Sequence, residues 1–72
     1  MYILTVREKE LLDYIIKFKQ VNGYSPTIRE MAKGLNTKST NHIRNMLNSL
    51  IDDGYITMRE KMPRTIVIRK FI

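Results

Sequence analysis

The chain has 72 residues, which fits one small domain (residues 1–72) and leaves no room for a second. It contains no cysteine, so the sequence excludes a disulfide framework and a thiolate metal site. The formal net charge of +6 favours a polyanionic partner such as nucleic acid. Because the apolar runs are too short for a membrane span or a secretion signal, we expect a cytoplasmic protein with no membrane partner.

The first two predicted helices begin with the same start signal. Thr5-x-x-Glu8 and Thr27-x-x-Glu30 both have the spacing of a capping box. The first helix is expected to end at Gly23, and the short second helix at Asn36, because both residue types tolerate positive φ. The expected inward-facing residues are Leu11, Leu12, Tyr14, Ile15, Ile16 and Phe18 in the first helix, and Ile28, Met31, Ala32 and Leu35 in the second.

The third predicted helix, about residues 39–52, has two faces of different chemistry. Ser39 is the expected N-cap, and Gly54 the expected end. Ile43, Met46, Leu47 and Leu50 form an apolar stripe, whereas Asn41, Arg44, Asn45 and Asn48 share a polar face at spacing i, i+3, i+4, i+7. Asparagine is a poor residue for a helix interior, so three on one face indicate a use other than solvation.

After Gly54 the hydrophobic period changes from 3.6 to 2. Residues 55–59 and 64–69 alternate, and residues 60–63 are typical of a turn. Ile56, Met58, Ile66 and Ile68 are expected to face the core. The sequence therefore predicts a small α+β fold, a winged helix-turn-helix in which a three-helix bundle is followed by a two-stranded β-hairpin wing.

This arrangement suits double-stranded DNA. The major groove is about 12 Å wide and admits one helix that is apolar behind and hydrogen-bonding in front. Asn41 and Asn45 can each pair with adenine, Arg44 can pair with guanine, and Ser39 can anchor the helix start. Phosphate contacts are expected from Thr40, His42 and Asn48. No Cys, second His or carboxylate cluster accompanies His42, so we expect no metal and no cofactor.

The wing is the most basic part of the chain. Residues 59–72 carry +4 of the total charge of +6. Arg59, Lys61 and Arg64 are expected to hold flanking phosphate, and Lys61 or Arg64 to enter the minor groove. No Gly-rich phosphate loop, paired carboxylates or Ser/His/Asp set can be assembled, so we expect neither an enzyme nor a small-molecule substrate.

Several motifs resemble the N-terminal DNA-binding domain of the LexA-type SOS repressors, without gaps over nearly the whole chain. They are Leu4-Thr5-x-Arg7, Gly23-x-x-Pro26-Thr27-x-x-Glu30-x-Ala32-x-x-Leu35, Ser39-x-Asn41, Leu47-x-x-Leu50, Gly54-x-Ile56, and Arg64 with Ile66. The resemblance implies a bacterial or phage transcription repressor with the third helix in the major groove. It also implies that Ser39 and Asn41 contact the operator.

The chain departs from that family in the helix that would contact DNA. His42, Arg44 and Asn45 stand where the family tends to have a small residue followed by acidic ones, so we expect a different operator half-site. The family also continues beyond this length into a self-cleaving protease and dimerisation domain. No Ser/Lys dyad can be placed here, and we expect no autocleavage.

Two other functions remain open from the sequence. The domain could be a protein-interaction module that docks onto a polymerase, a replication protein or a host repressor, using Phe71, Ile72 and exposed tyrosines. It could also bind DNA without sequence preference, in which case three groove-facing asparagines would be superfluous. For the DNA-binding function we expect a nucleoid-associated homodimer on two half-sites about one helical turn apart. Residues 68–72 would supply a strand edge for pairing with a second copy.

Overall fold

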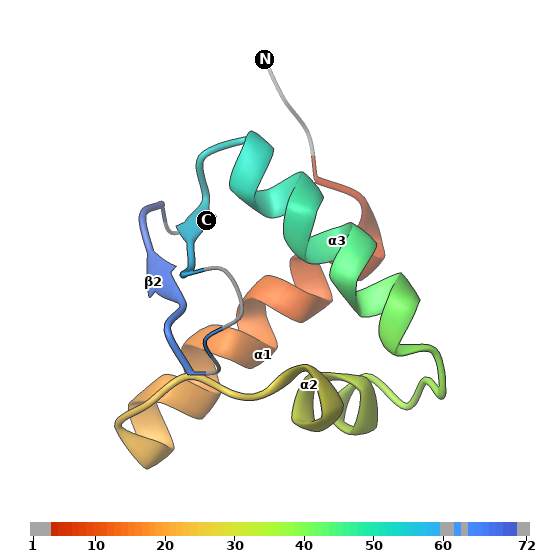
Figure 1. Ribbon diagram of the computed structural model, residues 1–72, viewed down its shortest axis with the longest axis horizontal. Helices are drawn as coiled ribbons and strands as arrows, with labels where there is room; N and C mark the ends of the chain where they lie inside the picture. The colour runs from red at the N-terminus through yellow and green to blue at the C-terminus, as the bar shows by residue number, and fades with distance from the viewer. Residues whose placement is uncertain (1–3, 60–61, 63, 71–72) are drawn as a thin grey trace.

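The computed structural model describes residues 4–59, 62 and 64–70. Three helices, α1 (Val6–Asn22), α2 (Ile28–Gly34) and α3 (Thr40–Asp52), precede an antiparallel pair of strands, β1 (Ile56–Thr57) and β2 (Val67–Ile68). Figure 1 shows the helices around a common centre, with the hairpin standing beside the second half of α1. The predicted α+β winged helix-turn-helix is confirmed.

The predicted helix starts are all present. Thr5 and Thr27 each accept a hydrogen bond from the backbone N–H three residues later, and the Glu8 and Glu30 carboxylates accept one in return, at 3.0 and 2.8 Å. The Ser39 hydroxyl accepts from the His42 N–H at 3.1 Å. These bonds satisfy N–H groups that a helix start leaves without partners, and they set where each helix begins.

The turn between α2 and α3 depends on a left-handed asparagine. Asn36 has φ 56° and directly follows Leu35, which is the actual cap of α2. The Thr37 N–H donates to the Ala32 carbonyl at 2.9 Å, which closes the turn in the manner of a Schellman motif. The left-handed conformation expected at Asn36 is therefore confirmed, one residue beyond the cap. Gly54, with φ 78°, has the same role after α3.

The core lies between the helices and the base of the hairpin. Helix α1 contributes fewer residues to this core than predicted. Tyr14, Ile16 and Phe18 were expected to face inward but are only half-buried. Each buried Leu or Ile contributes about 1.5–3 kcal/mol of stabilisation. The buried apolar residues are Leu11, Leu12, Ile15, Met31, Ala32, Leu35, Ile43, Met46, Leu47, Leu50, Ile56 and Ile66.

The hairpin has the predicted inward and outward faces but much shorter strands. Ile56 pairs with Ile68 and Thr57 with Val67, and no further pair forms within the described residues. Beyond these two pairs, the Arg59 N–H donates to the Thr65 hydroxyl at 3.0 Å, in place of a backbone hydrogen bond between the strands. A two-stranded ribbon this short is not stable alone, so the wing depends on contacts with the helices.

Gly34 allows α1 and α2 to approach closely. It is the last residue of α2, and a Cβ placed there would collide with the Tyr14 ring. That ring cannot move freely, since its hydroxyl donates to the Glu30 carbonyl at 3.2 Å. The glycine in the last turn of α2 is therefore required by packing.

We predict that Gly34→Ala destabilises the protein by about 1–3 kcal/mol, because the added methyl overpacks the α1–α2 contact. Helix propensity alone predicts the opposite sign, a gain of about 0.5–1 kcal/mol. Urea unfolding measures the change. In a Tyr14→Ala background the penalty should largely disappear, and a penalty that persists there would show that the ring is not its cause.

Candidate nucleic-acid interface

The polar side of α3 is fully available at the surface. Beneath it, Ile43 and Leu50 are 0% exposed, so the helix is firmly seated on the core. No acidic residue occupies its first turn, which leaves the positive end of the helix dipole without an internal counter-charge. The predicted site residues on this helix and its cap are all exposed: Ser39, Thr40, Asn41, His42, Arg44, Asn45 and Asn48.

The helix geometry brings the predicted base-contacting residues together. At 100° per residue, Asn41, Asn45 and Asn48 lie on the side opposite the buried stripe, and Arg44 lies at the edge of that group. Arg44 also lines a cleft of about 250 Å³ between α3 and the wing, together with Met58 and Met62. The exposed amides and the wing thus border the same side of the domain.

Ser39 combines a structural and a candidate binding role. Its hydroxyl oxygen accepts the capping bond from His42, and its own backbone N–H donates to the Thr37 hydroxyl at 3.3 Å. An oxygen that accepts in this way still has a hydroxyl proton that can be donated outward. The start of α3 therefore offers a hydroxyl donor beside the positive end of the helix dipole.

Three basic residues near this helix start were missed by the sequence analysis. Arg29 and Lys33 of α2 and Lys38 of the turn are exposed and line a groove of about 370 Å³ with Thr37 and Thr40. The available signal was the i, i+4 spacing of Arg29 and Lys33 on the outer face of α2. Their proximity to the start of α3 depends on the tight turn at Asn36.

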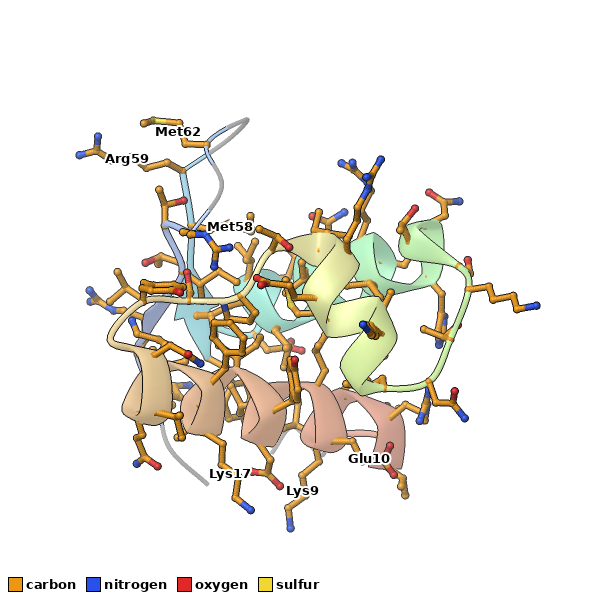
Figure 2. All side chains as sticks on the ribbon, turned by 90° about the horizontal axis from the view of Figure 1, so that it is seen from below. Lys9, Glu10, Lys17, Met58, Arg59 and Met62 are labelled. Carbon is orange, nitrogen blue, oxygen red and sulfur yellow. The ribbon has the colours of Figure 1, made fainter. Side chains whose placement is uncertain are left out.

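The wing carries an exposed cation, Arg59. Figure 2 shows Arg59 and Met62 projecting from the wing on the side opposite to the Lys9, Glu10 and Lys17 side chains of α1. Lys61, which was predicted to contact phosphate, lies outside the described residues, as do Phe71 and Ile72 of the predicted pairing edge.

Arg64 lines the same cleft as Arg44, and its side chain, 38% exposed, also contacts other parts of the protein. Its Nη1 lies 3.0 Å from Glu30 Oε1 and donates to the Ser25 carbonyl at 3.2 Å, and its guanidinium lies 4.5 Å from the centre of the Tyr24 ring. Arg64 was predicted to contact phosphate. Its contacts with Glu30, Ser25 and Tyr24, which are 34 to 40 residues away in the chain, were not predicted.

Two further bonds hold the base of the wing. The Ser25 hydroxyl, on a side chain that is only 1% exposed, accepts from the Ile66 N–H at 3.2 Å. Lys19 Nζ donates to the Ile66 carbonyl at 2.8 Å. A buried N–H without such a partner would cost about 1–3 kcal/mol of stability. Ser25, in the loop between α1 and α2, therefore has a specific structural role in holding the wing.

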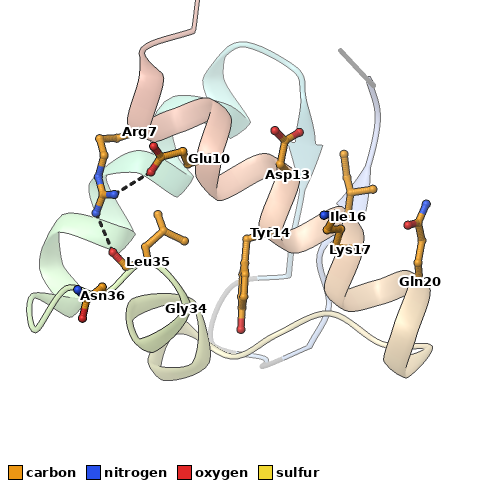
Figure 3. A pocket seen from close by; sticks show the side chains of 10 residues that line it. All are labelled: Arg7, Glu10, Asp13, Tyr14, Ile16, Lys17, Gln20, Gly34, Leu35 and Asn36. Atoms are coloured by element: carbon orange, nitrogen blue, oxygen red, sulfur yellow. Dashed lines mark hydrogen bonds and ion pairs between the residues drawn. The ribbon is translucent and has the colours of Figure 1, made fainter.

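A separate hollow of about 660 Å³ lies between α1 and the end of α2. Figure 3 shows Arg7 at one end of it, paired with Glu10 at 2.8 Å and bonded to the Leu35 carbonyl at 3.1 Å. The lining side chains carry both charges, and none is a predicted site residue. Arg7 therefore serves to join α1 to the end of α2.

Neither a metal-ligand cluster nor a membrane-spanning helix occurs in the part of the chain that the structure describes. Within it, no three His, Asp or Glu side chains gather as metal ligands would. No helix within these same residues has the length and apolar character needed to cross a bilayer.

Known proteins with similar sequences agree with this fold. Residues 1–65 match the model of the family described as LexA DNA binding domain. The chain belongs to this family. It is 36% identical to the LexA repressor of Myxococcus xanthus over 67 residues, which is 93% of this chain and 30% of that protein.

Two other LexA repressors show the same pattern. Identity is 37% over 62 residues with that of Ruminiclostridium cellulolyticum, covering 86% of this chain and 29% of the relative. It is 37% over 65 residues with that of Staphylococcus epidermidis, covering 90% and 32%. The chain thus spans about a third of the length of these LexA relatives, and the predicted resemblance is confirmed.

The Glu30 carboxylate should make stability depend on pH. The hydrogen bond from the Thr27 N–H, and then the Arg64 guanidinium, hold the pKa of Glu30 below its ordinary value of 4.5, against the opposing effect of burial. A lowered folded-state pKa stabilises the protein above pH 4.5, and this contribution is lost as the pH falls through the folded-state pKa.

We therefore predict that Glu30→Gln lowers the urea concentration at the midpoint of unfolding at pH 7, and lowers it less at pH 3. Both proteins share all other carboxylates, so general acid destabilisation cancels in the difference. In an Arg64→Gln background the difference at pH 7 should narrow, because the cation is gone. A difference that is the same at both pH values would contradict the assignment.

Proposed function

We propose that this protein is a sequence-specific, double-stranded DNA-binding transcriptional repressor of bacterial or phage origin. The observation that carries the proposal is the exposed amide-rich face of α3 above a fully buried apolar stripe. Such a helix can enter a major groove while it remains fixed to its domain. Membership of the LexA DNA-binding domain family supports the same function.

In this proposal Asn41 and Asn45 contact adenines, Arg44 contacts guanine, and Ser39 anchors the start of α3. Asparagine amides can donate to adenine N7 and accept from N6, which identifies the base as well as binding it. Because Arg44 and Asn45 stand where LexA-type repressors tend to have acidic residues, we propose a half-site that differs from theirs.

Phosphate contacts would surround this helix. Arg29, Lys33 and Lys38 lie beside its start, and Arg59 lies at the wing. Backbone contacts of this kind fix the orientation on the duplex and add affinity for any sequence. The other proposed phosphate ligands are Thr40, His42, Asn48 and Lys61.

A single small domain contacts few base pairs, so we propose that two copies bind two half-sites about one helical turn apart. With DNA as the ligand, we propose that the protein acts at the nucleoid, in the cytoplasm of a bacterial cell. The protein-interaction alternative relied on Phe71 and Ile72, which lie outside the described residues, and on the tyrosines, of which Tyr24 is exposed. It is the second candidate function that the DNA selection tests.

Selection from a random DNA pool tests this function directly. We expect one enriched motif, and for a dimer two copies of it with centres about 10–10.5 base pairs apart. If no motif is enriched while fragments are retained, the protein binds DNA without sequence preference. If no fragment is retained at physiological salt, the protein-interaction alternative is favoured.

Asn41→Ala should then weaken binding to the selected site by about 1–3 kcal/mol and leave binding to random DNA almost unchanged. Titration of both DNAs at one salt concentration measures this. Asn22→Ala, which removes an exposed amide from the far end of α1, is the matched control and should change neither affinity. Equal losses on both DNAs would remove Asn41 from base recognition.

A further inference from the structure

Arg64 differs from the other cations of the wing in how completely it is engaged. The two guanidinium nitrogens lie 3.0 and 3.4 Å from the two Glu30 oxygens, which is the paired geometry that arginine favours with a carboxylate. The Ser25 carbonyl and the Tyr24 ring occupy a further N–H and one face of the group. Glu30, Ser25 and Tyr24 thus hold a side chain that is still 38% exposed.

The backbone at Arg64 is also unusual. Its φ of 61° lies in the left-handed region, which a residue with a long side chain rarely adopts without support. Two residues later, the Ile66 N–H and carbonyl bond to Ser25 and Lys19. The chain therefore enters the base of the wing in a conformation that the clamped side chain of Arg64 helps to maintain.

Glu30 connects this clamp to α3. The same carboxylate that pairs with Arg64 accepts the capping bond from the Thr27 N–H at 2.8 Å, so it belongs to the first turn of α2. α2 packs directly against α3. A continuous chain of contacts thus runs from the wing through Arg64, Glu30 and α2 to the helix with the exposed amides.

We infer that Arg64 and Glu30 are positioning residues, which set the distance and angle between the wing and α3, and that Arg64 is not itself a phosphate ligand. The inference rests on the proposed DNA-binding function. Arg59, whose side chain is exposed near the end of the wing, then supplies a cation that this pair holds in place.

Two conservative variants separate positioning from direct binding, because the two roles predict opposite results. Arg64→Lys keeps the charge but loses the paired geometry. Glu30→Gln removes a negative charge from the DNA-binding side and keeps the capping box, which accepts Gln as well as Glu. For a direct phosphate ligand, Arg64→Lys would bind like the wild type and Glu30→Gln would bind more tightly.

For a positioning pair, both variants weaken binding to the selected site by about tenfold, within the range of coupling between residues of one ion-pair network. The double variant is then no weaker than either single one. Arg69→Lys and Glu10→Gln are the matched controls, since each makes the same chemical change at an exposed position away from the clamp. Wild-type affinity of Arg64→Lys, or tighter binding of Glu30→Gln, would overturn the inference.

Hydrogen exchange provides a readout that needs no DNA. In both variants we expect exchange at the Ile66 and Arg59 amides to accelerate more than exchange at the core amides of α1, which report only the global loss of stability predicted above for Glu30→Gln. Equal acceleration throughout the chain would mean a general loss of stability alone, and unchanged exchange at Ile66 and Arg59 would mean no anchoring; either result contradicts the inference. If the wild type binds no DNA, the proposed function fails, and hydrogen exchange still decides whether the pair anchors the wing.

Discussion

The seating of α3 on the core is the constraint on which the rest of the molecule depends. Ile43 and Leu50 are completely buried, and α3 packs against α1, α2 and β1. In a domain of 72 residues this one helix contributes much of the core and also presents the exposed amides. Both roles are compatible because the helical repeat separates the two faces.

The wing is held mainly by its attachment to the helices. Within the described residues its ladder has two residue pairs, which do not suffice for a stable ribbon. Ser25, Lys19 and Arg64 supply polar contacts from the wing to other elements. The angle between wing and helix is thus a property of side chains that lie far apart in the sequence.

Local signals predicted the features that neighbouring residues determine. The capping boxes at Thr5 and Thr27, the cap at Ser39 and the left-handed conformation at Asn36 all follow from short-range bonding and were found from sequence. So were the buried stripe of α3 and the two faces of the hairpin. These features sufficed for the fold and for the exposed face of the candidate site.

Contacts between distant residues could not be predicted in the same way. The Ser25 hydroxyl meets Ile66 across 41 positions, and Arg64 meets the Ser25 carbonyl across 39, so no periodicity reveals either contact. The basic groove at Arg29, Lys33 and Lys38 likewise forms only when α2 and α3 are assembled. The exposed face of α3 could therefore be predicted from the sequence, whereas the contacts that hold the wing beside it could not.

The separation of the two faces of α3 has an evolutionary consequence. Within the described residues, the side chains of Asn41, Arg44 and Asn45 form no hydrogen bond or ion pair, so they contribute little to folding. Ser39, in contrast, caps the helix and is constrained by that role. Under the proposed function, new target preferences arise by replacing those three side chains on an unchanged scaffold, and divergence among descendants should concentrate there.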